Sequence, residues 1–359
     1  MNTGFKKNLG AGWLYAYIHF ITEVVCFFIL SRNVGDSVML WIFPLVYDAL
    51  AFVPQSIIGY ISDKYPKINF GVIGSVLLCA GVVLSSVPLL PGKFTGLTIL
   101  CLGNACAHVS GAEVTLRCSE GNLSHSAIFV GAGSFGVISG KLLGQTAMPY
   151  PIVAAAALTA IPFALLAEIY RAKTNEKPCI GFDYHSKKIH PAVVVILAVA
   201  IVIVRGYMGY GIPTSWNKTV IQTVMLYVTM GIGKMLGGVL ADMFGVKKIA
   251  IFSAAAALPF LLAGDQLMTV SLIGVMFFSM TMSITLALLV SVLKNAPGLA
   301  FGLTTIGLFC GTAPIFFFKF NTLEANCTII SALTVLCIAA MLIIIRKDEK
   351  NVKRNNLHG

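Results

Sequence analysis

The chain has 359 residues, of which 57% are hydrophobic and only 11% are charged, and its mean hydropathy is +0.88. Soluble domains carry roughly a quarter charged residues, so this composition excludes a soluble globular protein and indicates a polytopic membrane protein. The formal net charge of +11 does not call for a nucleic-acid partner, because the excess is spread over many short loops on one predicted face.

Twelve apolar runs have about the 20 residues that a helix needs to cross a bilayer. The sequence therefore predicts an all-α protein with six spans in each half. The first six lie near 9–31, 38–62, 68–89, 94–116, 124–147 and 150–170. The second six lie near 191–213, 219–241, 247–264, 267–292, 297–320 and 326–345. The predicted division is an N-terminal bundle (1–170), a linker (171–190), a C-terminal bundle (191–345) and a tail (346–359).

Most of the 25 Lys and Arg residues fall in loops on one side of these spans. Because cytoplasmic loops retain positive charge, we expect both termini, the linker and the tail to be cytoplasmic, in a protein of the plasma (cytoplasmic) membrane. The loops leave no room for a catalytic domain, and the sequence has no Walker loop, catalytic triad or GxSxG motif. The nine cysteines form no CxxC pair. We expect neither enzyme activity, nor a cofactor, nor a metal site.

One loop motif occurs twice, each time at the end of an apolar run. GYISDKYPK at 59–67 is repeated in altered form as GVLADMFGVKK at 238–248, and Asp242 lies 179 positions after Asp63, half the length of the chain. A period of half the chain indicates two homologous bundles, an arrangement that many transporters share. The candidate gating residues in the two copies are Gly59, Asp63, Lys64, Lys67, Gly238, Asp242 and Lys247.

The pattern GxxxD followed by basic residues, after the second and the eighth predicted span, resembles motif A of the major facilitator superfamily. The resemblance implies the fold of that superfamily: two pseudo-symmetric six-helix bundles around a cavity that opens alternately to each side. It also implies transport of a small solute by a monomer in the lipid bilayer, with the proton as the usual coupling ion. Pro66, Met243 and Val246 depart from the usual motif. We expect Asp63 and Asp242 to bind an adjoining helix N-terminus and basic residues, although charged loops that only set topology are the other interpretation.

Two further stretches resemble members of the same superfamily. Gly136, Gly140 and Gly144 form a stripe on the fifth predicted helix that is similar to motif C of antiporters, GxxxGPxxG, with Lys141 at the proline position. A crossing of two helices at small residues is the other interpretation of this stripe. On the fourth predicted helix, GNACAHVSG at 103–111 resembles the GN…H stretch of fosmidomycin-resistance-type efflux proteins.

Charges at bilayer depth are expensive and usually face a cavity or a partner. The candidate substrate-binding and proton-binding residues are His19, Glu23, Asp48, His108, Lys141, Arg205 and Lys234. His19 and Glu23 lie four positions apart and share a helix face. His108 either carries a proton, a role to which histidine is suited, or is a structural histidine bonded to a neighbouring helix. Two interpretations stay open: Glu23 and Arg205 form a structural ion pair, or Arg205 binds an anionic substrate while Glu23 or Asp48 carries a proton.

The sequence thus predicts secondary active transport of a small organic solute, with the proton as coupling ion and a preference for anions. Efflux of a drug or metabolite by antiport is an alternative that rests on the glycine stripe and the GN…H stretch. A membrane sensor that keeps a transporter fold without transporting is an alternative from another class. The sequence determines neither the solute nor the direction of movement.

Overall fold

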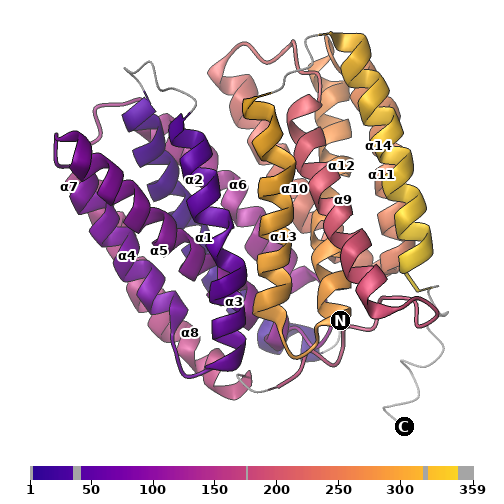
Figure 1. The fold of residues 1–359 in the computed structure, drawn as a ribbon, viewed down its shortest axis with the longest axis horizontal. Coiled ribbons are helices and arrows are strands. Elements are labelled where there is room, and N and C mark those ends of the chain that lie inside the picture. The colour runs from indigo at the N-terminus through magenta and orange to yellow at the C-terminus, as the bar shows by residue number, and fades with distance from the viewer. Residues whose placement is uncertain (1–2, 35–41, 175–176, 318–321, 347–359) are drawn as a thin grey trace.

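The computed structural model describes residues 3–34, 42–174, 177–317 and 322–346 (Figure 1). The elements of the first half are α1 (Thr3–Val34), α2 (Ile42–Phe52), α3 (Pro54–Lys64), α4 (Phe70–Ser85), α5 (Leu90–Cys118), α6 (Ser124–Gly144), α7 (Tyr150–Leu158) and α8 (Ala160–Thr174). Those of the second half are α9 (Pro191–Gly211), α10 (Val220–Phe244), α11 (Val246–Ala263), α12 (Met268–Val292), α13 (Pro297–Thr312), the short 3₁₀ helix η1 (Ala313–Phe316) and α14 (Leu323–Ile344).

These elements make twelve apolar segments, as predicted. Two pairs, α2 with α3 and α7 with α8, are single spans with a break, and the first break falls at Pro54, whose ring removes a backbone donor. Within the described ranges, eleven segments are long and apolar enough to cross a membrane, and the shorter α4 is the twelfth. Parts of the predicted spans 38–62 and 297–320, and almost all of the predicted tail, lie outside the described residues.

Local side chains explain where several helices begin. The Asn69 side chain accepts a hydrogen bond from the backbone N–H of Val72 at 3.0 Å and starts α4. At the start of α10, Thr219 and Gln222 form a capping box in which each side chain accepts a bond from the backbone of the other residue. Both devices satisfy backbone donors that a helix N-terminus leaves unpaired. The helix starts at Phe70 and Val220 therefore lie within two residues of the starts predicted at 68 and 219.

The two halves converge at the end of the molecule where residues 177–190 connect them, and they diverge toward the opposite end (Figure 1). Between the halves, α3 packs against α13 and α6 packs against α10. The converging end is called the linker side below.

The connecting segment is bound to both halves. Tyr184 donates its hydroxyl hydrogen to the carbonyl of Gly121 in the first half. The backbone N–H of Cys179 donates to the carbonyl of Lys294 in the second half, at 2.8 Å. Phe182 is fully buried in an apolar core to which both halves contribute. This segment is therefore part of the packed structure that closes the linker side.

Candidate functional site

Three titratable side chains of the first half meet in its interior. His19 and Glu23 extend from one face of α1, and His108 extends from α5. The two histidine Nε2 atoms are 2.7 Å apart, and the Glu23 Oε1 atom lies 3.1 Å from Nε2 of His108 and 3.5 Å from Nε2 of His19. All three side chains are buried. We call these three residues the His–Glu cluster.

The hydrogen bonds around this cluster orient its two imidazole rings and leave a position for one added proton. Nδ1 of His19 lies 2.7 Å from the carbonyl oxygen of Phe129, and Nδ1 of His108 lies 2.9 Å from the carbonyl oxygen of Asn104. Carbonyl oxygens only accept, so both Nδ1 atoms donate, and two neutral imidazoles would face each other with bare Nε2 lone pairs. At 2.7 Å that contact is attractive only when one added proton lies between the nitrogens. The Glu23 carboxylate balances its charge.

The donors of the cluster also belong to types that bind transition metals, since each histidine offers one nitrogen and Glu23 offers a carboxylate. In a tetrahedral zinc site with Zn–N bonds of about 2.0–2.1 Å, two ligand nitrogens stand roughly 3.3 Å apart. The Nε2 atoms of His19 and His108 are closer, at 2.7 Å. Their spacing fits a shared proton better than a metal ion.

Three half-buried cations lie farther along the interior, on helices of both halves; we call Lys141, Arg205 and Lys234 the central cations. Lys141 Nζ on α6 donates to the hydroxyl of Tyr227 at 2.6 Å, and Lys234 Nζ on α10 donates to that of Ser134 at 2.9 Å. Arg205 on α9 donates from Nη2 to a backbone carbonyl, that of Phe278, at 2.9 Å. Among the described residues, no carboxylate lies within ion-pair distance of a central cation.

The central cations and the His–Glu cluster nevertheless influence one another. Lys234 interacts electrostatically with both Glu23 and Arg205, and Asp48, half-buried on α2, interacts electrostatically with Lys141 and Glu23. The ion pair between Glu23 and Arg205 that one interpretation of the sequence predicted is not among the ion pairs of the described residues, since Glu23 contacts the two histidines instead. Lys234 is therefore the central cation that interacts with both Glu23 and Arg205.

On the linker side, Asp63 at the end of α3 binds the N-terminus of α13 in the opposite half. Its carboxylate accepts hydrogen bonds from the backbone N–H groups of Gly298 at 3.1 Å and Leu299 at 2.8 Å. These donors have no partner within their own helix, and the helix dipole favours a negative charge at this end. A Cβ atom on Gly59, one turn earlier, would collide with the Gly298 carbonyl, so glycine is what lets the two backbones approach so closely.

Asp242 makes the equivalent contact in the other direction. Located at the end of α10, it accepts hydrogen bonds from the backbone N–H groups of Leu123 at 2.8 Å and Ser124 at 2.9 Å, where α6 begins. Gly238, one turn earlier, faces the Leu123 carbonyl and the Ala127 side chain. The two copies of the motif thus join the halves by the same geometry, with an aspartate of each half at a helix N-terminus of the other. We call these contacts the two aspartate contacts.

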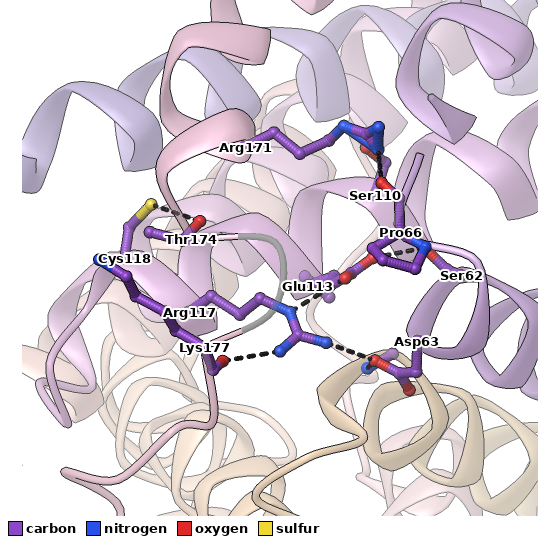
Figure 2. A network of polar contacts seen from close by, with 12 residues as sticks. Ser62, Asp63, Pro66, Ser110, Glu113, Arg117, Cys118, Arg171, Thr174 and Lys177 are labelled. Carbon is purple, nitrogen blue, oxygen red and sulfur yellow. Dashed lines mark hydrogen bonds and ion pairs between the residues drawn. The ribbon is translucent and has the colours of Figure 1, made fainter. Parts of the chain in front are cut away.

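The sequence analysis missed the residues that support Asp63. Figure 2 shows Arg117 on α5 between three acceptors: Asp63 at 3.0 Å, Glu113 at 3.0 Å and the carbonyl of Lys177 at 2.7 Å. Glu113 also accepts a hydrogen bond from Ser62. The only signal in the sequence was the i,i+4 spacing of Glu113 and Arg117 at the end of an apolar run.

The basic residues of the motif itself lie elsewhere. Lys64 extends over the rings of Tyr60 and Tyr65 at 5.8 and 5.4 Å, and Lys67 is exposed. Lys247 donates to the carbonyls of Leu342 and Ile345 at the end of α14, at 3.0 and 3.1 Å. Hence Arg117, rather than Lys64 or Lys67, is the cation that forms an ion pair with Asp63.

The glycine stripe of α6 packs against α1 inside the first half. Cβ atoms at Gly136, Gly140 and Gly144 would meet backbone carbonyls of Phe20, Val24 and Phe28, which are one turn apart along α1. The stripe thus has a structural explanation in helix packing. Lys141 extends toward α10, where it meets Tyr227.

No family model and no curated protein matches the sequence. The fold is similar to that of FucP, a transporter of the major facilitator superfamily, in its outward conformation, with a TM-score of 0.64 and 14% identity over 94% of this chain and 99% of that chain. A variant of the E. coli fucose:proton symporter FucP also has a TM-score of 0.64, with 15% identity over 92% of this chain and 97% of that chain. The human organic anion transporter MFSD10 (TETRAN) has a TM-score of 0.63, with 11% identity over 96% of this chain and 100% of that chain.

These similarities extend over nearly the whole chain on both sides. Together with the apolar spans, they show that the chain is a multi-pass membrane protein with the fold of major facilitator superfamily transporters. The resemblance to the major facilitator superfamily that the repeated motif indicated is therefore confirmed for the fold.

Proposed function

We propose that this protein is a secondary transporter that moves a small anionic organic solute by alternating access, coupled to a proton. The observation that carries the proposal is that the hydrogen bonds of the three central cations all go to neutral groups, in the interior of a transporter fold. A buried charge without a counter-charge costs several kcal/mol. A bound anion supplies that counter-charge. The names of two structural neighbours, a fucose:proton symporter and an organic anion transporter, agree with this assignment.

The His–Glu cluster is the proposed proton site. While the cluster holds its proton, the imidazolium neutralises Glu23, and Lys234 is left for the solute. Without the proton, the Glu23 carboxylate attracts Lys234 and competes with the anion. Proton binding and anion binding therefore strengthen each other, and by linkage the effect is reciprocal. This sign of coupling favours symport of the anion with the proton over exchange of one for the other.

The two aspartate contacts are the proposed gate on the linker side. They join the halves where the described structure is closed, so they must break when the cavity opens to that side. We place this side in the cytoplasm of a plasma-membrane protein because most loop lysines and arginines lie there. Both termini are then cytoplasmic.

The first test is proton flux in vesicles that contain the purified protein and a pH dye, challenged with pools of anionic, neutral and cationic metabolites. We expect Arg205→Ala to abolish anion-dependent proton flux without preventing membrane insertion, because it removes a central cation whose Nε atom has no partner in the described structure. The matched control is Lys218→Ala, which removes an exposed cation.

Three outcomes contradict the proposal in different ways. A fully active Arg205→Ala protein removes this residue from the site. Proton flux with lipophilic or cationic compounds and none with anions supports the efflux alternative. An anion that stabilises the purified protein against heat, without any movement of solute, supports the sensor alternative.

A native cysteine reports on the proposed gate. Cys179 lies in the connecting segment with 4% of its surface exposed, and burial raises the pKa of its thiol to about 12. In a variant with Cys179 as its only cysteine, we expect slow reaction with maleimide. Asp63→Asn is expected to accelerate the reaction about tenfold, because it weakens charge-assisted hydrogen bonds worth about 1.5–3 kcal/mol.

The control for this labelling is a protein whose only cysteine is introduced by Lys218→Cys, at an exposed position in the loop between α9 and α10; its reaction is expected to be equally fast with and without the Asp63→Asn substitution. An unchanged Cys179 rate in the Asp63→Asn protein would show that the aspartate contact does not hold the linker side closed.

A further inference from the structure

Two of the central cations, Lys141 and Lys234, lie at separate points along the interface between α6 and α10. α6 and α10 are antiparallel neighbours, since the start of α6 contacts the end of α10 through Asp242. Lys234 pairs with Ser134, and Lys141 pairs with Tyr227. Seven residues separate the two pairs on each helix, which corresponds to roughly 10 Å along the axis. The ammonium group of Lys141 therefore lies farther from the linker side than that of Lys234. We call Lys234 together with Arg205 the inner point and Lys141 the outer point.

Each point has donors that the protein leaves available. An ammonium group has three donors, and Lys141 and Lys234 each use one on a hydroxyl. At the inner point, Arg205 interacts electrostatically with Lys234, and its Nε atom has no partner in the described structure. At the outer point, the Lys141 Nζ atom lies 4.8 Å from the ring centre of Tyr227 and 5.5 Å from that of Phe27. Both points can thus bind an anionic group directly.

The charges near these points do not balance. The His–Glu cluster is neutral when it holds its proton. Outside the cluster, Asp48 provides the one carboxylate of the described residues that interacts electrostatically with a central cation, Lys141. With Asp48 ionised, three cations and one carboxylate leave an excess of two positive charges over the two points taken together. A monoanion leaves one of these uncompensated in the interior, whereas a dianion balances both.

We propose that the solute is a dianion, such as a dicarboxylate, with one anionic group at Arg205 and Lys234 and the other at Lys141. This proposal rests on the proposed anion transport and specifies its substrate class. The inner point binds the group that every transported anion has in common. The outer point distinguishes dianions from monoanions, because a monoanion has no second group to place there.

The test compares unbranched monocarboxylates and dicarboxylates of four to nine carbons as ligands of the purified protein, by thermal stabilisation and by proton flux in vesicles. At the best chain length, we expect the dicarboxylate to bind at least about tenfold more tightly than the monocarboxylate, which corresponds to 1.4 kcal/mol. Lys141→Gln is expected to reduce this ratio to below about threefold, while the affinity for the monocarboxylate stays within about twofold. Lys141→Arg keeps the charge and is expected to keep the preference.

The outcomes separate this proposal from the broader one. If monocarboxylates bind as tightly as dicarboxylates, or if Lys141→Gln weakens both classes equally, the dianion assignment is wrong although anion transport stands. If no anion of either class stabilises the protein or moves protons, the proposed function itself fails. Lys218→Gln, which removes an exposed cation, is the control. It is expected to change neither the affinity for monocarboxylates nor the preference for dicarboxylates.

Discussion

Replacing Gly59 by valine is expected to lower transport about a hundredfold, because the protein can then no longer close its linker side. A Cβ atom at this position would overlap with the backbone carbonyl of Gly298 and the backbone nitrogen of Leu299, and backbone atoms cannot rotate away as a side chain can. Separation of α3 from α13 also costs the hydrogen bonds of Asp63. Overpacking costs about 1–3 kcal/mol, and each hydrogen bond to a charged group contributes about 1.5–3 kcal/mol. The sum exceeds the roughly 2.8 kcal/mol that correspond to a hundredfold change.

Two measurements identify the cause of this loss. Solute uptake into vesicles gives the rate, and maleimide labelling of Cys179 as the only cysteine gives the population with an open linker side, which is expected to increase. Gly209→Val is the matched control, because a Cβ atom at Gly209 would have no neighbour within 4 Å. Full uptake with unchanged labelling in the Gly59→Val protein would show that α3 and α13 tolerate separation in every state.

The fold was predictable because its causes are local or periodic. Apolar runs of membrane length located the twelve segments, and the repeat of Asp63 at Asp242 revealed two equivalent halves. The break between α2 and α3 follows from Pro54, whose ring interrupts the helical hydrogen bonds. The ends of the helices were less predictable, because they depend on caps such as Asn69 and on tertiary contacts.

Site partners that are distant in the sequence were not predictable. The sequence showed that His19 and Glu23 share a helix face, but only the packing of α5 against α1 brings His108 within 2.7 Å of His19. Arg117 reaches Asp63 across 54 positions for the same kind of reason. The basic residues next to Asp63 were the partners expected from the sequence, yet Lys64 extends over the rings of Tyr60 and Tyr65 instead.

The second large effect is expected at His108, whose replacement by glutamine is predicted to uncouple the solute from the proton. In the native cluster, the two Nε2 atoms face each other at 2.7 Å and provide the proposed position for the added proton. With glutamine at position 108, the remaining imidazole of His19 no longer faces a second nitrogen lone pair. Solute accumulation driven by a pH gradient is expected to fall about a hundredfold, whereas exchange of labelled for unlabelled solute without a gradient continues with reduced affinity.

The reduced affinity follows from charge, and a second substitution isolates it. In the His108→Gln protein, Glu23 keeps its carboxylate and competes with the solute for Lys234. Adding Glu23→Gln to His108→Gln is therefore expected to restore the affinity measured by exchange without restoring accumulation.

His125→Gln is the control, since His125 is also buried but has no hydrogen-bond partner for either ring nitrogen among the described residues. Uptake of solute and protons in an unchanged ratio by the His108→Gln protein would place the proton site elsewhere, with Asp48 as the next candidate. The loss of coupling in the single variant, together with recovered exchange in the double variant, would establish that one proton on the His–Glu cluster controls whether Lys234 is available to the anion.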